Sequence, residues 1–248
     1  MTDLLYYPLG ELQEAVFVRR ENRFRAEVEL NGQIVKAHVP NSGRMQELLV
    51  SGAKVWVKPV KEDGPHKKTE RKTSCTLVLV QQGERYICLH AHLANEIVAF
   101  WLEHDILPEF AGCTQIAREQ KLGTSRMDFS LYRGDVCCYA EVKSVNLLVD
   151  DTARFPDAPT ARGSRHLQEL IACKAQGLDA AVIFLVMGND AKQFAPNTAT
   201  DPAFADSLAQ ALQHGVEVYV YTCEIDLQGV RYTGRIPVQE ESEWKSMH

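Results

Sequence analysis

The sequence predicts a two-part protein in which a small β-barrel is followed by a larger α/β unit. Three observations carry this prediction. The first ninety of the 248 residues show strand patterns without a helical period, the pair Asn31-Gly32 marks a tight hairpin, and apolar residues recur at helical spacing from Ala91 onward. The length suits one large or two small domains, and no linker composition marks a boundary. We place the domains at residues 1–90 and 91–248.

The first part is expected to hold short strands at residues 14–20, 24–30, 33–39, 53–60, 73–80 and 85–89. Asn31 and Gly32 tolerate the positive φ of a type I′ turn, which would join the second strand to the third. Five or six short strands in so short a segment favour a small closed barrel. The OB-fold is a common barrel of this size that binds nucleic acid, so an OB-like barrel is expected here by analogy.

The second part alternates helices and strands. Pro108 ends the first helix, and Asp201-Pro202 supplies an N-cap and a first helical residue for the third. Helices are expected through residues 97–104, from Ser164 to Gly177, and from Asp201 to Gly215. Strands are expected at residues 114–122, 126–132, 136–145, 180–187 and 216–225. The order is helix, three strands, helix, strand, helix, strand.

Cysteine usage indicates a cytoplasmic protein, whereas the charge balance neither requires nor excludes a nucleic-acid partner. The net charge is −6, but residues 1–90 carry 14 basic and 11 acidic side chains, whereas the remainder carries 13 and 22. A basic part joined to an acidic part is compatible with nucleic-acid binding. The seven cysteines include no Cys-x-x-Cys pair, no apolar run has membrane-spanning length, and the N-terminus lacks a secretory signal. We therefore expect a cytoplasmic protein with free thiols.

One predicted strand carries charges that are costly in an apolar environment. In strand 136–145, Glu141 and Lys143 point to one face because side chains alternate along a strand. Asp128 lies on the preceding strand and meets Glu141 if the two strands pair. Two carboxylates and an ammonium are costly to bury unless they hold a metal ion and each other. With a backbone carbonyl they suit Mg²⁺ or Mn²⁺, which polarises a phosphate oxygen and lowers the pKa of a bound water.

The pattern of Asp128, Glu141 and Lys143 on adjacent strands between two helices resembles the core of the PD-(D/E)xK nuclease superfamily. A Glu-x-Lys triplet alone is more often a solvated ion pair on an edge strand, and the flanking order of helix, three strands and helix favours the nuclease-like interpretation. The resemblance implies a restriction-endonuclease-like α/β domain. Asp128 and Glu141 would be metal ligands, and all three residues would be catalytic.

Further segments follow one another in a characteristic order: PNSGRM at 40–45, SRMDF at 125–129, EVKSV at 141–145, FPDA at 155–158, and the pairs Arg162-Gly163, His166-Leu167 and Glu169-Leu170. Together they resemble the sugar fermentation stimulation protein A family over roughly residues 5–240. The resemblance implies an OB-like first domain, a nuclease-like second domain and DNA binding with little sequence preference. Arg44, Pro159 and Ala161 depart from the residues expected of the family, whereas the Asp, Glu and Lys set is intact.

Two acidic residues compete for the place of a third carboxylate. Glu96 lies on the first helix and Glu119 on strand 114–122. By analogy with the superfamily, Glu96 is expected to be a metal ligand and a catalytic residue, the alternative being a solvated helix face. His166, near the start of the second helix, is expected to face the scissile phosphate as a catalytic residue, the alternative being a surface histidine.

Basic clusters predict where a phosphate backbone binds. The first hairpin mixes arginines with Phe17 and Phe24, as on a surface that stacks single-stranded bases, although core packing explains the aromatic residues equally well. The run from Lys58 to Lys72 holds six cations and three anions and either tracks a backbone or forms a solvated loop. The expected nucleic-acid contacts are Arg19, Arg20, Arg23, Arg44, Lys67, Lys68, Arg71, Lys72, Arg162 and Arg165.

The favoured interpretation is a DNA-binding protein of low sequence specificity with a Mg²⁺- or Mn²⁺-dependent phosphodiesterase site. The alternative is a non-enzymatic DNA-binding regulatory protein linked to sugar (maltose) metabolism. An RNA-processing enzyme is a third interpretation, because phosphate contacts carry no information about the sugar. A membrane partner is not expected, and the oligomeric state is left open, a dimer included.

Overall fold

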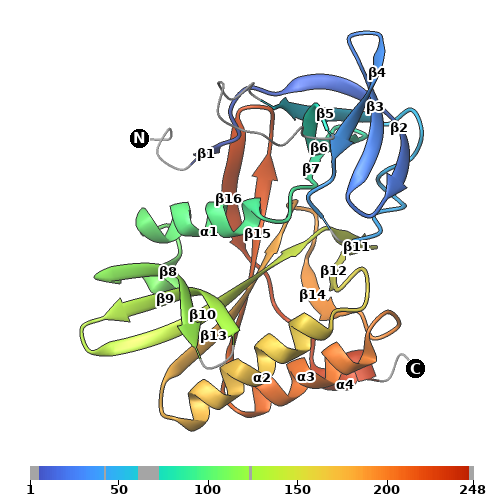
Figure 1. Cartoon of the computed structure of the whole chain (residues 1–248). Helices are drawn as coiled ribbons and strands as arrows, with labels where there is room; N and C mark the ends of the chain where they lie inside the picture. The colour runs from blue at the N-terminus through green and yellow to red at the C-terminus, as the bar shows by residue number, and fades with distance from the viewer. Residues whose placement is uncertain (1–5, 42, 61–72, 123–124, 246–248) are drawn as a thin grey trace. The chain divides into compact units, whose positions relative to one another are not determined.

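The computed structural model describes residues 6–41, 43–60, 73–122 and 125–245, and the chain divides into two compact units (Figure 1). The barrel unit contains residues 8–92 together with 225–230. The sheet unit contains residues 93–224 and the residues from 231 onward, together with Tyr6 and Tyr7. Each unit thus includes a short segment from the other end of the chain, so the division is not a single cut.

Within the described residues, six strands build the barrel unit. They are β2 (Gln13–Asn22), β3 (Arg25–Leu30), β4 (Gln33–His38), β5 (Lys54–Pro59), β6 (Cys75–Gln82) and β7 (Arg85–Cys88). They pair in the order β4-β3-β2-β5-β6-β7, and a parallel pairing of β4 with β6 closes the ring. All six predicted strands are therefore found. Asn31 and Gly32 have φ values of 53° and 76°, as the predicted turn requires.

Apolar side chains that alternate along these strands fill the barrel. Val28 and Val55 are fully buried, and Met45 and Leu48 from the segment between β4 and β5 join the same core. Phe17 is 2% exposed and belongs to this core, so core packing explains it. Phe24 is 51% exposed and remains available to contact a partner.

A mixed sheet forms the centre of the sheet unit. Its order among the described residues is β1 (Tyr6–Pro8), β16 (Gly229–Arg235), β15 (Glu217–Ile225), β13 (Asp179–Val186), β10 (Val136–Val145), β9 (Ser125–Arg133) and β8 (Gln115–Leu122). Strands β10, β13 and β15 are parallel, whereas β8, β9 and β10 pair antiparallel. This places β9 and β10 side by side, which is the condition under which Asp128 and Glu141 were expected to meet.

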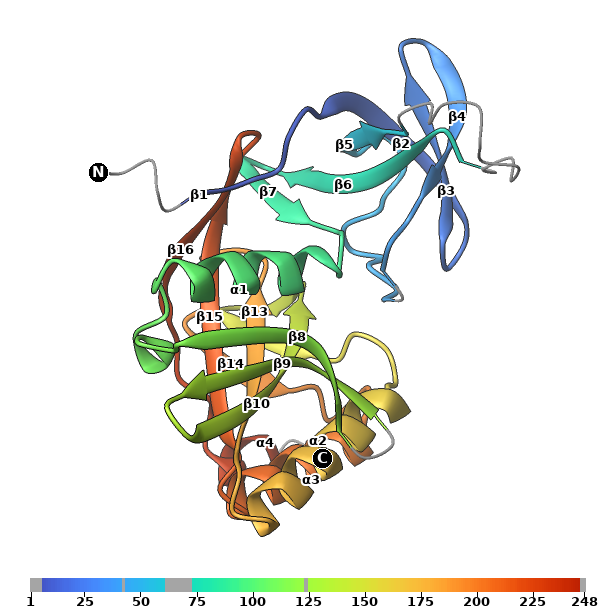
Figure 2. The ribbon, with the colours of Figure 1, turned by 60° about the vertical axis from the view of Figure 1, so that its left-hand side comes forward.

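Helices cover both faces of this sheet (Figure 2). Helices α2 (Ala161–Ala175) and α3 (Pro202–Gln213) pack Leu167 and Phe204 against Phe184 of β13. Helix α1 (Leu93–Glu103) and the 3-10 helix η2 (Pro108–Phe110) belong to the other face, where Phe110 contacts the ring of Tyr219. Tyr219 and its neighbours along β15 alternate between the two faces, so both sides of the strand are buried.

The start of α2 differs from the prediction. The helix begins at Ala161, not Ser164, because the Thr160 side chain caps it by accepting a hydrogen bond from Gly163 N at 3.0 Å. A Cβ on Gly163 would lie 2.8 Å from Thr160 Cγ2, so glycine is required for this close approach. The predicted cap of α3 is confirmed: Asp201 accepts from Phe204 N, and its other oxygen accepts from Thr160 N. One carboxylate thus ties the starts of α2 and α3 together.

Several short elements had no clear sequence signal. They are β1, β16, η2, the small sheet of β11 (Leu147–Val149), β12 (Thr152–Phe155) and β14 (Gln193–Pro196), and helix α4 (Glu241–Lys245). Most are stabilised by partners far away in the sequence, as where β12 pairs with β14. No helix in the described part of the chain is long and apolar enough to cross a membrane.

Candidate functional site

The neighbouring strands β9 and β10 bring Asp128 beside Glu141. Their antiparallel register ends with the pair Phe129 and Ala140, and the next residues of the two strands are Asp128 and Glu141. The Asp128 carboxylate accepts a hydrogen bond from the backbone N–H of Val142 at 2.8 Å. The backbone of β10 therefore holds Asp128 at the edge where the antiparallel pairing ends.

The two carboxylate oxygens of Glu141 have unequal surroundings. Oε1 accepts a hydrogen bond from Lys143 Nζ at 2.6 Å and a second, short one from His166 Nδ1. Oε2 is buried and has no hydrogen-bond partner among the described residues. Only 4% of the Glu141 side chain is exposed. A buried acceptor without a partner is rare in proteins and marks a place that an external group would satisfy.

Burial and charge shift the two carboxyl groups in opposite directions. Burial and the neighbouring Glu141 charge raise the pKa of Asp128 to about 6. Burial also acts to raise the pKa of Glu141, but the hydrogen bond from His166 and the charge of Lys143 outweigh it and hold this pKa below its ordinary value. At neutral pH two carboxylates therefore share one nearby ammonium group, and the surplus negative charge favours a cation.

His166 lies between Glu141 and Arg162, and its partners identify which ring nitrogen carries the proton. Arg162 Nε donates to His166 Nε2 at 3.2 Å, so Nε2 is an acceptor. Nδ1 then carries a proton and donates it in a hydrogen bond to Glu141 Oε1, and the Lys143 Nζ lies 3.3 Å from the same nitrogen. His166 is 2% exposed, so it is not the surface histidine considered as an alternative. Its two nitrogens already have partners within the protein, and the ring orients Glu141.

Helix α1 reaches the site through Asn95, which precedes the predicted ligand Glu96. Asn95 Nδ2 donates to Asp128 Oδ1 at 2.7 Å. The Glu96 carboxylate instead forms two hydrogen bonds with the Arg118 guanidinium and is 45% exposed. One position along a helix is a rotation of about 100°, so neighbouring residues face different surroundings. The helix therefore supplies a neutral amide to the site, and the structure does not bring Glu96 to Asp128.

Glu119, the other candidate for a third carboxylate, also lies apart from the site. It is exposed, has a φ of 51° and pairs with Arg126 at 3.0 Å. Asn95 was missed by sequence reasoning. The only signal that pointed to it was its place beside Glu96 on a helix expected to pack near the strands.

The donor set fits a hard divalent cation. No three His, Cys, Asp or Glu side chains in the described ranges are grouped as a metal site. Mg²⁺ is nevertheless commonly held by one or two carboxylates together with waters and substrate phosphates. Asp128 and Glu141 meet that requirement, and the unpartnered Oε2 of Glu141 is the atom on which the fit depends.

The predicted nucleic-acid contacts in the barrel unit have different surroundings. Arg20 donates to backbone carbonyls of residues 22, 23, 41, 43 and 44, so its guanidinium holds the β2–β3 hairpin against the segment after β4. Arg19 pairs with Glu27 at 2.7 Å. Arg23 and Arg44 have exposed side chains. Four predicted contacts lie outside the described residues: Lys67, Lys68, Arg71 and Lys72.

The two arginines predicted on α2 both lie near its N-terminus and are exposed. Arg162 contacts His166, one helical turn further along, and so adjoins the carboxylate site. Within the described residues, Arg165 forms no hydrogen bond or ion pair with that group. The structure therefore joins one predicted phosphate contact to the predicted catalytic residues.

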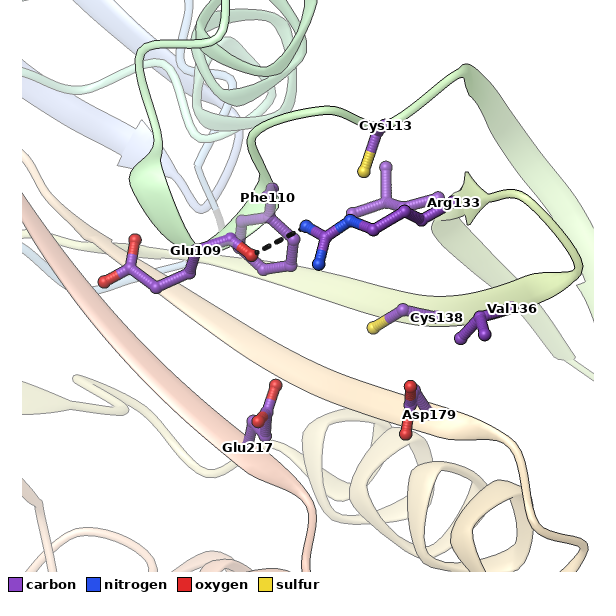
Figure 3. A pocket seen from close by; sticks show the side chains of 9 residues that line it. Glu109, Phe110, Cys113, Arg133, Val136, Cys138, Asp179 and Glu217 are labelled. Atoms are coloured by element: carbon purple, nitrogen blue, oxygen red, sulfur yellow. Dashed lines mark hydrogen bonds between the residues drawn. The ribbon is translucent and has the colours of Figure 1, made fainter.

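A cavity of about 190 Å³ lies elsewhere in the sheet unit, where β10, β13 and β15 begin. Figure 3 shows Asp179 and Glu217 on one side of it and Arg133 on the other. These groups already have partners: Asp179 pairs with a lysine, Glu217 accepts from a tyrosine hydroxyl, and Arg133 donates to two backbone carbonyls. Cys138 lines the cavity and points to the opposite face of β10 from Glu141, so this cavity is separate from the carboxylate site.

Two family models match consecutive parts of the chain. Residues 18–89 match a family model described as the SfsA N-terminal OB domain, and residues 92–229 match one described as the sugar fermentation stimulation protein RE domain. The predicted fold class, an OB-like barrel followed by a restriction-endonuclease-like α/β domain, is confirmed.

Relatives match over most of their length. A sugar fermentation stimulation protein homologue of Caldanaerobacter subterraneus is 40% identical over 90% of this chain and 94% of its own. One from Moorella thermoacetica is 42% identical over 88% and 92%. Among solved structures, that of Pyrococcus furiosus SfsA in complex with Ca²⁺ has a TM-score of 0.85 and 29% identity, covering 95% of this chain and 99% of that one.

Proposed function

Since the chain belongs to the sugar fermentation stimulation protein family, we propose that it is a DNA-binding protein of low sequence specificity with a phosphodiesterase site that depends on Mg²⁺ or Mn²⁺. The observation that carries the proposal is the buried Oε2 of Glu141, which has no partner among the described residues. Glu141 is on β10, and the backbone N–H of the next residue, Val142, donates a hydrogen bond to Asp128. A protein that only bound DNA would gain nothing from a buried, unsatisfied carboxylate oxygen, which costs free energy of folding.

Asp128 and Glu141 would hold the ion. When bound, it supplies a Lewis acid that polarises a phosphate oxygen and lowers the pKa of a water molecule. The complex of the Pyrococcus furiosus relative with Ca²⁺ supports a hard, oxygen-seeking cation. The barrel unit, with exposed Phe24 and Arg23, supports nucleic-acid binding.

The remaining residues of the site stabilise charge and fix geometry. Lys143 keeps its ammonium group 2.6 Å from Glu141 Oε1, where it can stabilise the negative charge that develops on a phosphate in the transition state. His166 holds Oε1 of Glu141 and Asn95 holds Oδ1 of Asp128. Such supporting hydrogen bonds orient the groups that ligate a metal ion.

The test of the catalytic proposal combines calorimetric titration with Mn²⁺ and a plasmid-nicking assay on the full chain. Wild type is expected to bind Mn²⁺ and to nick DNA only when the ion is present, whereas Asp128→Asn is expected to do neither. A wild-type protein that binds no divalent ion and cleaves no DNA under any of them would reject the proposal and favour the DNA-binding regulatory alternative.

DNA binding is tested separately by fluorescence anisotropy with oligonucleotides of unrelated sequence. We expect similar affinities for all of them, and log K should fall linearly as log salt rises, because phosphate contacts release counterions. Affinity that differs strongly between sequences, or that does not respond to salt, would contradict the low-specificity proposal. A matched RNA series distinguishes the two nucleic acids.

A further inference from the structure

Arg162 connects the surface of the sheet unit to the buried carboxylate site. It is the second residue of α2 and its side chain is exposed. Its Nε donates to His166 Nε2 at 3.2 Å, and the structure gives its two Nη groups no hydrogen bond or ion pair within the described residues. A guanidinium has five N–H donors in a rigid plane, so one is used inward and four remain for a partner outside.

The contacts continue inward without a break. Arg162 meets Nε2 of His166, and Nδ1 of the same ring meets Oε1 of Glu141. His166 is 2% exposed, so the packing around its ring restricts how the ring can turn. Holding Oε1 in this way is what leaves Oε2 of Glu141 available. The position of the exposed guanidinium therefore bears on the orientation of the buried carboxylate.

The start of α2 also suits an anion. The first N–H groups of a helix and its dipole attract negative charge, and a guanidinium binds a phosphate through two parallel hydrogen bonds. Arg165 adds a second exposed cation on the same turn. The unpartnered Oε2 of Glu141 is the independent observation that a cation belongs nearby, and a bound cation there would add to the attraction for a phosphate.

We propose that Arg162 couples nucleic-acid binding to metal binding: a backbone phosphate held by its Nη groups fixes the guanidinium, and through His166 this fixes Glu141 with Oε2 free for the ion. The inference rests on the proposed function and deepens it. Coupling between two sites is reciprocal, so DNA tightens metal binding by the same factor as the metal tightens DNA binding. Glu141 would then be held in the orientation that binds the metal ion only where a phosphate backbone is present.

The experiment measures Ca²⁺ binding calorimetrically to the full chain, with and without a short DNA duplex. In wild type the duplex is expected to tighten Ca²⁺ binding by about 5- to 150-fold, the usual range of coupling between sites. Arg162→Lys keeps the charge but not the planar fork, so it cannot hold both a phosphate and His166. We expect this variant to lose at least about 5-fold of the coupling and to keep the salt dependence of DNA binding, because the number of neutralised phosphates is unchanged.

Two further variants separate coupling from general damage. Arg165→Lys makes the same chemical change on the same turn without the His166 contact and is expected to retain the wild-type coupling. His166→Asn keeps an N–H near the place of Nδ1 but removes the acceptor for Arg162, so it is expected to lose coupling as Arg162→Lys does. Nitrogen NMR of the His166 ring adds a direct readout: the Nε2 resonance should move in Arg162→Lys and on addition of the duplex to wild type.

The outcomes are distinguishable. If wild type binds Ca²⁺ and DNA but Arg162→Lys retains the full coupling, the inference is rejected and the proposed function stands. If wild type binds Ca²⁺ and DNA independently of each other, the inference is rejected and the proposed function again stands. If wild type binds no Ca²⁺ with or without DNA and no Mn²⁺, both the proposed function and the inference are rejected.

Discussion

Two carboxylates of the sheet unit, Glu96 and Glu141, each accept two hydrogen bonds, yet they differ in what remains free. Glu96 receives one donor from Arg118 on each oxygen, so both oxygens are satisfied, and the side chain is 45% exposed. Glu141 receives both of its donors on Oε1, and its Oε2 is buried without a partner. The same residue type therefore forms a closed surface ion pair in one place and an open, buried acceptor in the other.

The two glutamates differ in both the distribution of their donors and their burial: Glu96 is satisfied on both oxygens at the surface, whereas Glu141 keeps one buried oxygen without a partner. A planar guanidinium binds both oxygens of a carboxylate at once. At Glu141, by contrast, the ammonium group of Lys143 and the imidazole of His166 both donate to Oε1, and Oε2 is left without a donor. The superfamily pattern pointed to Glu96, but the adjacent Asn95 is the residue that α1 turns toward Asp128.

The sharpest test of the comparison exchanges each carboxylate for its amide. Glu141→Gln is expected to abolish Mn²⁺ binding and DNA cleavage, because a neutral amide is a poor ligand for a hard cation. Glu96→Gln is the matched control and should leave Mn²⁺ affinity unchanged, with a loss of stability of about 0.2–1 kcal/mol from the exposed ion pair. Calorimetric titration of both variants decides the question. Equal losses of Mn²⁺ binding would show that Glu96 also serves the metal.

Removing the ammonium group separates metal binding from catalysis. Lys143→Ala is expected to lower the cleavage rate by about 10²–10³, the typical cost of losing one transition-state contact. Its Mn²⁺ affinity should be retained or improved, since a positive charge beside Glu141 is removed. Rates measured at saturating Mn²⁺, together with the titration, check the assignment. Loss of Mn²⁺ binding in a folded Lys143→Ala would mean that Lys143 acts by positioning Glu141.

The amide on α1 is expected to matter through Asp128. Asn95→Ala removes the donor to Asp128 Oδ1 and should weaken Mn²⁺ binding by about 10–100-fold, as other supporting groups around metals do. Glu96→Ala, one residue further along the same helix, is the control and should have no such effect. Calorimetry on both variants, with thermal melts to confirm folding, provides the measurement. If the two variants behave alike, the Asn95 contact has no special role.

A pH-dependent stability measurement tests the burial of Asp128, whose pKa is raised from 3.8 to about 6. The folded state then holds this proton more tightly than the unfolded state, so stability should fall as pH rises from about 4 to about 6. The cost at higher pH is roughly 1–3 kcal/mol. Asp128→Asn removes it, and in the absence of metal should be more stable than wild type at pH 7 by up to that amount. Urea unfolding at pH 4 and pH 7 gives both values; a wild type with no excess loss over the variant between these pH values would contradict the raised pKa.

Local patterns in the sequence predicted those elements whose cause is local. The Asn31-Gly32 turn, the Asp201 cap of α3 and the strand 136–145 are found where they were expected, because φ preference, capping and side-chain alternation act over a few residues. The start of α2 was misplaced because Thr160 and Gly163 form a cap that depends on their close approach. Strands such as β12 and β14 escaped prediction since each depends on a partner distant in sequence.

The sequence by itself indicated two consecutive strands, one with Asp128 and one with Glu141 and Lys143, because side-chain alternation acts over a few residues, and it placed the two carboxylates together on the condition that these strands pair. Only the tertiary structure decided which oxygen of Glu141 stays free, and that Asn95, not Glu96, reaches Asp128. It also decided that the exposed Arg162 supports the buried His166. These outcomes depend on the rotation of α1 and α2 against the sheet, which is set by packing over the whole sheet unit and leaves no trace in a short stretch of sequence.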